Sequence, residues 1–433
     1  MIKKRALVIL ACLISLSGCA PLNFYSKIDP YIASGDFKSA DDIVDKEKKQ
    51  YEGMHELLYY FDKGSLLQML GDFKGSISNL DKAEDTIDSL YTKSATKEIS
   101  SFFSNDMNLP YEGEDFEQVM VNVMKALDYM YMDDFDGARV EARKVNNRLN
   151  LLTDRYEGKN KYKDDAFARY LSAFSYEAEG NLNDAYIDYK KSYQAYQDYA
   201  GLYSSEMPED LKADLLRVSQ ALHRTDDYNA YKADFNGMQY MEQTELNSMG
   251  EVLIVIYDGM APFKVSNFIQ SPVYNEKTGK TTLVRVAFPK YVSRYYRINS
   301  ATASIAGADY NSFVTEDLNT MAIANLEDKN ALISVKAIAR AAAKYIAGEA
   351  ISSGAKNQWL DMAVNIYNVA SEQADTRSWR TLPARFQVIR MQLKPGKYDI
   401  NVRLNMLDGS VKEETVSVKI KERQKKAVPV FAF

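Results

Sequence analysis

Apolar and aromatic positions in the first half of the chain recur every three or four residues, which is the period of an α-helix. The clearest case runs from Ala185 to Tyr203, where six tyrosines follow one another at spacings of three or four: Tyr186, Tyr189, Tyr193, Tyr196, Tyr199 and Tyr203. At about 100° per residue, these side chains share one face of a helix. Such a stripe either packs on a neighbouring helix or forms a binding wall.

A short pattern also repeats along this half: glycine or aspartate, then an aromatic residue or leucine, then a small residue. Copies start at Gly35, Gly71, Asp133 and Gly180, and Asp226 opens a weaker fifth copy. Glycine ends a first helix, and small residues let two helices pack closely. The copies resemble the turn and second-helix start of tetratricopeptide repeats. This resemblance implies an irregular array of paired helices over residues 28–245.

The tyrosine stripe divides at the end of the repeat. Its first three members occupy positions where an aromatic side chain fills the gap between paired helices, so we expect them in the core. Tyr196, Tyr199 and Tyr203 continue beyond the normal length of the repeat. Two interpretations stay open for them. They wall a groove that captures a peptide or glycan, which makes them candidate partner-binding residues, or they form a cap packed on the fifth unit.

The helical period gives way to short β-branched or alternating runs near residue 245. We expect strands at residues 252–257, 282–288, 385–393, 397–404 and 414–420. Pro395-Gly396 and Asp408-Gly409 predict tight hairpin turns. The expected fold class is therefore α+β: a tetratricopeptide-like (TPR-like) α-helical array, followed over 246–433 by an antiparallel β-sandwich-like domain with a helical-hairpin insertion at about 315–371.

The predicted insertion carries basic residues at every fourth position, at Lys336, Arg340 and Lys344, beside an alanine-rich face. One interpretation lays this helix on lipid headgroups or lipopolysaccharide phosphates. The other makes the basic stripe a solvated face of a helix packed on its hairpin partner. The second interpretation is favoured, because charged stripes at helical spacing are usually solvated.

Three further candidate partner-binding residues close the insertion: Arg377, Trp379 and Arg380, preceded by Asp375. An Asp/Arg pair with a tryptophan either locks the insertion onto the sheet or presents an exposed hot spot to a partner. The structural interpretation is favoured here too, and the exposed alternative stays open.

The N-terminus has a basic start, an apolar run from residue 6 to residue 16 and the sequence Leu16-Ser17-Gly18-Cys19. This resembles the signal of bacterial lipoproteins. The resemblance implies that residues 1–18 are removed, that Cys19 is acylated, and that residues 19–27 form a lipidated tether. Ala20, rather than aspartate, implies the outer membrane, and we expect the protein on its periplasmic face. Cys12 is lost with the signal, so the mature chain is expected to form no disulfide.

Charge is divided unevenly along the chain, which has a formal net charge of −6. Residues 19–250 contain 26 Lys and Arg against 43 Asp and Glu, whereas residues 251–433 contain 25 against 17. This polarity either docks the two halves on each other or orients the molecule on an anionic surface. An acidic half and an envelope location argue against nucleic acid as a partner.

Recognisable catalytic motifs are missing from the sequence. Its two histidines, His55 and His223, lie on separate predicted helices, and neither metalloprotease nor serine-hydrolase motifs occur. Gly279-Lys280-Thr281 is similar to the end of a phosphate-binding loop, but it lies between strands and predicts a hairpin turn. We therefore expect a protein that is not an enzyme and that holds neither a cofactor nor a metal.

Four segments together resemble a family of bacterial envelope lipoproteins with TPR-like helices, whose biochemical role is uncharacterised. They lie at residues 110–148, 165–177, 259–262 and 374–383. Within the first segment, Glu117, Asn122, Glu141 and Arg143 are polar positions on amphipathic helices. We expect these four to form a structural hydrogen-bond network between helices rather than a ligand site.

Two functional hypotheses follow. The leading one is a non-catalytic scaffold, lipid-anchored in the envelope, whose TPR-like helices bind another envelope protein or an extended peptide. The alternative is a protein that binds or hydrolyses peptidoglycan or lipopolysaccharide, with Tyr196, Tyr199 and Tyr203 as stacking platforms for sugar rings.

Overall fold

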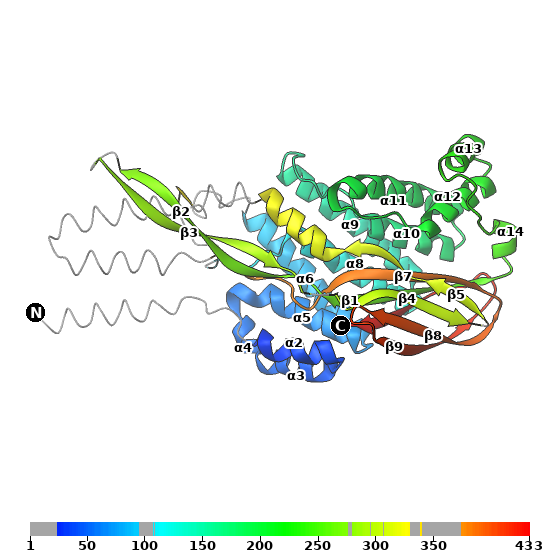
Figure 1. The fold of residues 1–433 in the computed structure, drawn as a ribbon, viewed down its shortest axis with the longest axis horizontal. Coiled ribbons are helices and arrows are strands. Elements are labelled where there is room, and N and C mark those ends of the chain that lie inside the picture. The colour runs from blue at the N-terminus through cyan, green and yellow to red at the C-terminus, as the bar shows by residue number, and fades with distance from the viewer. Residues whose placement is uncertain are drawn as a thin grey trace, which may run out of the picture.

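The computed structural model has three parts: a helical array, two stacked β-sheets and a projecting β-hairpin (Figure 1). The structure describes residues 24–94, 107, 109–275, 279–294, 296–305, 307–329, 338, 339 and 374–433. The predicted signal peptide and Cys19 lie outside the described residues. The α+β class predicted from the sequence is confirmed.

Helix hairpins, five in the part of the chain that the structure describes, make up the array. They are α2 (Tyr25–Ser34) with α3 (Phe37–Lys46), α5 (Glu56–Met69) with α6 (Phe73–Ser94), α8 (Asp115–Tyr131) with α9 (Phe135–Arg155), α10 (Ala166–Ala178) with α11 (Leu182–Tyr203), and α12 (Glu209–Ala221) with α13 (Thr225–Asp234). Short elements join them: α4 (Lys48–Tyr51), the 3-10 helix Gly53–His55 and α14 (Gln243–Leu246).

The repeated sequence pattern marks the turns inside these hairpins. In each turn, the residue two positions before the second helix has a positive φ. These residues are Gly35, Gly71, Asp133, Gly180 and His223. In the first four hairpins the next side chain then accepts a hydrogen bond from a backbone N–H of the new helix, as Asp36 does from Ser39 and Asn181 from Asp184. This cap satisfies a donor that the helix leaves free. The fifth hairpin has no such cap, and its second helix, α13, begins at Thr225, slightly before the predicted position.

Two four-stranded sheets stack on the array. The first sheet has the order β10-β1-β7-β6, with β1 (Gly250–Met260), β6 (Phe313–Asp317), β7 (Pro383–Leu393) and β10 (Lys425–Ala432). The second sheet has the order β5-β4-β8-β9, with β4 (Ile298–Ile305), β5 (Ala308–Asn311), β8 (Gly396–Met406) and β9 (Val411–Ile420). All pairs in these two sheets are antiparallel except β1 with β10, which is parallel.

Strand β1 is buried on both faces, which explains its uninterrupted apolar sequence. Val252, Ile254 and Ile256 face the second sheet and share a core with it. The alternate residues, such as Leu253 and Val255, belong to the core of the helical array. The molecule is therefore layered as helices, first sheet and second sheet, and the array and the first sheet have one continuous core.

The predicted turn at Asp408-Gly409 joins two paired strands, β8 and β9, as expected. The expectation of a hairpin at Pro395-Gly396 is wrong, because the strands that it connects, β7 and β8, belong to different sheets. The predicted strands at 252–257, 385–393, 397–404 and 414–420 are confirmed. Several other strands are short or carry polar residues at both faces, so their sequence period is weak.

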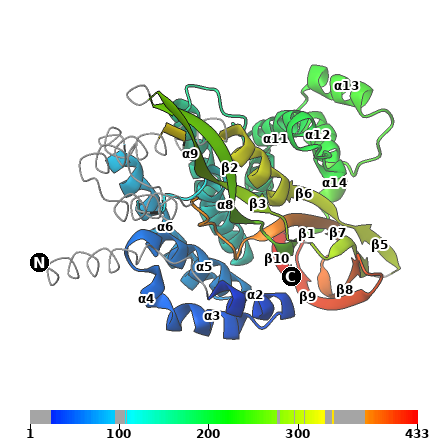
Figure 2. The same cartoon turned by 60° about the vertical axis from the view of Figure 1, so that its left-hand side comes forward.

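Two further strands, β2 (Phe263–Asn275) and β3 (Lys280–Val292), pair with each other and with no other strand of the described residues. They form a long ribbon that extends away from the layered body, and we call it the β2–β3 arm (Figures 1 and 2). Gly279, at φ +68°, stands in its turn as predicted, whereas Lys280 and Thr281 already belong to β3, where they pair with Asn275 and Tyr274. After β6, residues 318–329 are helical and open the predicted insertion, whose larger part lies outside the described residues.

The described helices were also compared with the length and hydropathy that a bilayer requires. Among the described residues, none of the helices combines enough length with enough apolar sequence to cross a membrane.

Candidate functional site

The last three tyrosines of the stripe are buried, at 1% exposed for Tyr196, 4% for Tyr199 and 7% for Tyr203. Tyr196 donates a hydrogen bond to the Thr315 carbonyl oxygen at 2.8 Å, and Tyr199 donates one to the Asp164 carbonyl oxygen at 3.2 Å. Their rings contact one another edge to face. The expectation that they wall an open groove is therefore corrected. They pack instead against β6, which enters this space from more than a hundred residues away.

These tyrosines also surround two buried carboxyl groups. Asp165 accepts hydrogen bonds from the Tyr162 hydroxyl and the Ala168 N–H, each at 2.7 Å. Glu316 is 2% exposed, and neither of its carboxyl oxygens has a hydrogen-bond partner among the described residues. Burial, and then the nearby Asp165 and Asp317, raise the pKa of Glu316 well above its usual value. Burial likewise raises the pKa of Asp165 to about 6.

Arg377, Trp379 and Arg380 belong to an extended segment, residues 374–382, that lies against the helical array. Arg377 pairs with Asp375 and donates hydrogen bonds to the carbonyl oxygens of Met54 and Leu109 at 2.9 and 2.8 Å. Because Arg377 is 6% exposed and Trp379 1% exposed, the alternative of an exposed hot spot is wrong for both.

We call residues 374–382 the locking segment. Trp379 makes its central contacts. Its ring stacks on Phe61 with centroids 4.1 Å apart, and its indole N–H donates to the Ser65 hydroxyl at 2.9 Å. Its backbone N–H donates to Glu117 Oε1 at 2.7 Å. Next to it, Arg380 pairs with Asp29 of α2 at 2.5 Å. The segment therefore ties the end of the insertion to three helix hairpins.

Lys336, Arg340 and Lys344 lie outside the described residues, as does Cys19. The anionic-surface contact and the lipidation predicted for them stay predictions.

The four residues expected to form one polar network are divided among three separate contacts. Asn122 donates to Glu141 Oε2 at 2.8 Å, and Lys125 pairs with the same carboxylate at 2.9 Å. Lys125 was not among the residues predicted for this network. Glu117 instead accepts from Tyr111 and from the locking segment, and burial raises its pKa to about 7. Arg143 donates to the Tyr176 hydroxyl at 2.6 Å.

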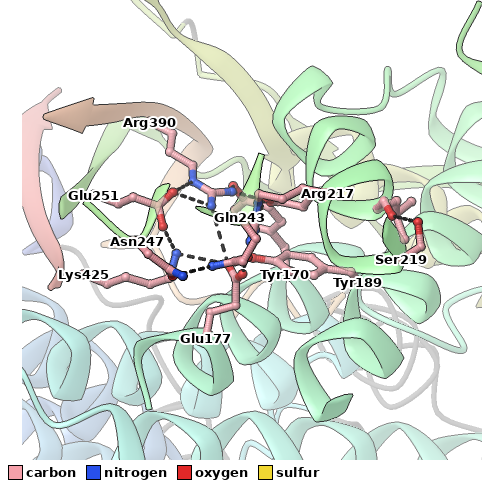
Figure 3. A network of polar contacts seen from close by, with 12 residues as sticks. Tyr170, Glu177, Tyr189, Arg217, Ser219, Gln243, Asn247, Glu251, Arg390 and Lys425 are labelled. Carbon is pink, nitrogen blue, oxygen red and sulfur yellow. Dashed lines mark hydrogen bonds and ion pairs between the residues drawn. The ribbon is translucent and has the colours of Figure 1, made fainter. Parts of the chain in front are cut away.

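A buried ion network joins the acidic helices to the basic strands (Figure 3). Arg390 of β7 donates to Glu251 Oε1 at 2.6 and 2.8 Å and also pairs with Asp214 of α12. Arg217 pairs with Glu177 and Asp214, both at 2.6 Å. Lys425 of β10 completes the network with Glu177 at 3.0 Å and with Glu251.

The alternation of cations and carboxylates in this network favours the ionised form of its carboxyl groups. Burial by itself would raise the pKa of Glu251, but Arg390 and Lys425 outweigh burial and lower that pKa to about 2. A second contact between the halves, in which Lys264 of the arm's base and Lys329 pair with Glu114, likewise lowers the pKa of Glu114 to about 2. The charge asymmetry along the sequence thus corresponds to ion pairs that dock the two halves on each other.

Since the first sheet and the locking segment cover the inner side of the array, an open surface is found elsewhere, at its end. A groove of about 770 Å³ lies between α11, α12 and the segment after α13. The half-buried side chains of Tyr193, Met207, Phe235 and Met238 line it, and the Tyr193 and Phe235 rings meet edge to face at 5.8 Å. Charged residues of both signs, Glu209, Lys212 and Asp234, stand at the rim.

The sequence placed Tyr193 in the core, and the structure makes it a groove residue. The Tyr193 side chain is half-buried, with its ring against Tyr231 of α13 and Phe235. The signal that identifies the groove is local: methionine and phenylalanine flank a polar Asn236-Gly237 turn after the last repeat.

The two histidines lie on different parts of the helical array. His55 is buried and His223 is exposed in the turn of the last hairpin. Among the described residues, acidic and histidine side chains form no group that can hold a metal ion.

The chain was compared with known proteins at the level of sequence and of structure. Neither a protein-family model nor a curated protein matches its sequence. A solved structure with distant similarity is that of BtubC (BKLC) from P. vanneervenii, at 13% identity and a TM-score of 0.33. That similarity covers 50% of this chain and 81% of the other. At this level it supports no inference about function.

Proposed function

We propose that this protein is a non-catalytic scaffold, lipid-anchored at the periplasmic face of the outer membrane, that binds an envelope protein or an extended peptide at the free end of its helical array. The observation that supports this proposal best is the groove between α11, α12 and the α13 turn. It combines a floor of aromatic and methionine side chains with a rim of both charges.

The composition of the groove suits a polypeptide ligand. Methionine side chains adapt their shape to an apolar partner, and aromatic rings supply contact area at a low cost in side-chain entropy. Glu209 and Lys212 provide one acceptor and one donor at the same edge. Backbone and charged groups of a peptide can therefore pair at the rim while its apolar side chains enter the groove.

The rest of the array is better suited to rigidity than to binding. In ordinary helical-repeat proteins the inner surface is open to ligands. Here the first sheet and the locking segment fill that position, and the buried ion network fixes the sheet in place. The glycan-binding alternative loses its basis, because the tyrosines that it requires as stacking platforms are buried.

In-cell photo-crosslinking tests the proposal. A photoreactive amino acid is introduced at Tyr193, Phe235 or Met238 in the native lipoprotein, and crosslinked products are identified by mass spectrometry. Ile187 is the matched control, because it lies on α11 as Tyr193 does and is 45% exposed. We expect one reproducible partner from the groove positions and none of it from Ile187. Equal labelling from all four positions, or the absence of any reproducible product, contradicts the proposal.

A further inference from the structure

The most exposed large apolar side chains of the β2–β3 arm share one of its faces. Tyr274 is 60% exposed, Leu283 63% and Phe268 40%. Directly paired residues of an antiparallel ribbon point to the same side. Because Leu283 pairs with Pro272, and Pro272 lies two and four residues from the other two side chains, all four belong to one face. We call this the apolar face of the arm.

The charges on the two strands of the arm are of one sign. Strands β2 and β3 carry Lys264, Lys280, Arg285 and Lys290 and no aspartate or glutamate. The whole chain, by contrast, has a formal net charge of −6. Arg285 lies 3.6 Å from the centre of the Phe268 ring, so a cation stands within the apolar face. A surface that combines apolar and cationic groups complements an apolar partner with negative charges.

The base of the arm lies beside the first described helix. Arg380 and Arg294 stand 4.6 and 5.9 Å from the centre of the Phe263 ring, and both pair with Asp29 of α2. The described chain begins at Phe24, five residues after Cys19. Five residues span at most about 18 Å. A lipid anchor at Cys19, as the proposed function assumes, thus keeps the base of the arm close to the bilayer.

We propose that the apolar face of the β2–β3 arm lies on an anionic phospholipid surface and orients the body of the protein on it. Phe268, Tyr274 and Leu283 enter the interface between headgroups and acyl chains, and Arg285, on the same face, contacts lipid phosphates. The arm does not cross the bilayer, because both edges of a two-stranded ribbon carry unpaired backbone groups that hydrocarbon cannot satisfy. Residues 266–274 of β2, which lie beyond the buried base of the arm, contact the surface over about 30 Å.

Charge favours an anionic lipid surface, rather than a second copy of the chain, as the partner of the apolar face. Two arms that meet apolar face to apolar face bring their two Arg285 side chains together, and neither strand of either arm has a carboxylate to pair with them. An anionic lipid surface removes this repulsion.

Vesicle flotation tests the proposal with the full mature chain carrying Cys19→Ser, which cannot be acylated. We expect the protein to float with vesicles of phosphatidylglycerol and phosphatidylcholine, to remain behind with phosphatidylcholine alone, and to lose binding as salt is raised. The triple substitution Phe268→Thr, Tyr274→Thr and Leu283→Thr is expected to weaken vesicle binding by about tenfold or more, since it removes three inserting side chains.

The matched control replaces two apolar residues on another hairpin, Leu407→Thr and Val411→Thr, which are each 56% exposed. It should leave vesicle binding unchanged, and circular dichroism checks that both variants are folded. Failure to float with phosphatidylglycerol vesicles overturns the proposal, as does equal binding by the triple variant. Self-association that the triple substitution abolishes, without vesicle binding, identifies a second copy as the occupant and also overturns it. None of these results depends on the groove, whose crosslinked partner tests the proposed function separately.

Discussion

Arg390 and Glu316 lie on adjacent strands of the first sheet, β7 and β6, and both side chains are buried beneath the helical array. Around Arg390, three cations and three carboxylates alternate, and each ion has at least one partner of opposite charge. Around Glu316, the nearest described charges, Asp165 and Asp317, have the same sign as the glutamate. Equal burial thus produces opposite shifts in pKa, downward for Glu251 and upward for Glu316.

The difference shows how the sequence's charge asymmetry is used. Where basic strands such as β7 and β10 meet acidic helices, ion pairs compensate the cost of removing charge from water. Strand β6 contributes an acidic residue to an acidic region, so that compensation fails and the neutral form of Glu316 is favoured. The first cluster therefore fixes the sheet on the array, while the second makes the same interface sensitive to pH.

The largest effect is expected from Arg390→Met. It leaves Glu251 and Asp214 buried with one fewer cation, and breaking a buried pair in this way costs about 3–5 kcal/mol. Urea unfolding of purified mature protein measures the loss. The control Arg403→Met removes a 43% exposed arginine that pairs with Asp309 at 3.6 Å, and it should change stability by less than about 0.5 kcal/mol. A similar small change for both variants means that the network adds little to stability.

Glu316→Gln is expected to raise the free energy of unfolding, whereas Arg390→Met lowers it. The amide keeps the shape of the side chain and removes the cost of protonating or burying a lone carboxylate at neutral pH, which stabilises the protein by about 1–3 kcal/mol. Glu413→Gln on exposed β9 is the control, since it makes the same change of net charge without the burial. Thermal unfolding at pH 7.5 compares the three proteins, and a destabilised Glu316→Gln variant contradicts the interpretation of Glu316 as uncompensated.

The smallest expected effect is a pH dependence of the stability difference between the wild type and Glu316→Gln. A carboxyl whose pKa is raised on folding binds more protons when folded, so its contribution is present below the unfolded pKa and is lost as pH rises. For Asp165 this loss runs from about pH 4 to about 6, and Glu316 extends it above about 4.5. Glu251, with its pKa at about 2, acts in the opposite direction, since its contribution is lost only as pH falls from about 4.5 toward 2.

Unfolding free energies at pH 4.5, 5.5, 6.5 and 7.5 measure this dependence in the wild type and in Glu316→Gln. We expect the advantage of the variant to grow with pH across the series. A constant difference is the result that excludes titration of Glu316 in this range.

The helix hairpins and several strands were predictable because their signals are local. Gly or Asp followed by Asp or Asn marks four of the five described turns, and the apolar run of β1 identifies a strand. The candidate site was not predictable in the same way. Trp379 and Tyr196 have the composition of binding residues, and their burial depends on Phe61 and Thr315, which lie far away in the sequence.

The sequence by itself determined the class of fold, the turns of the array, the division into an acidic and a basic half and, as an expectation, the lipid anchor. Each of these follows from neighbouring residues or from composition. Only the tertiary structure decided which aromatic faces are covered, which charges are paired and which surfaces remain open. Those outcomes depend on which distant segment packs against a given face, since the same amphipathic pattern serves equally for a core and for a binding site.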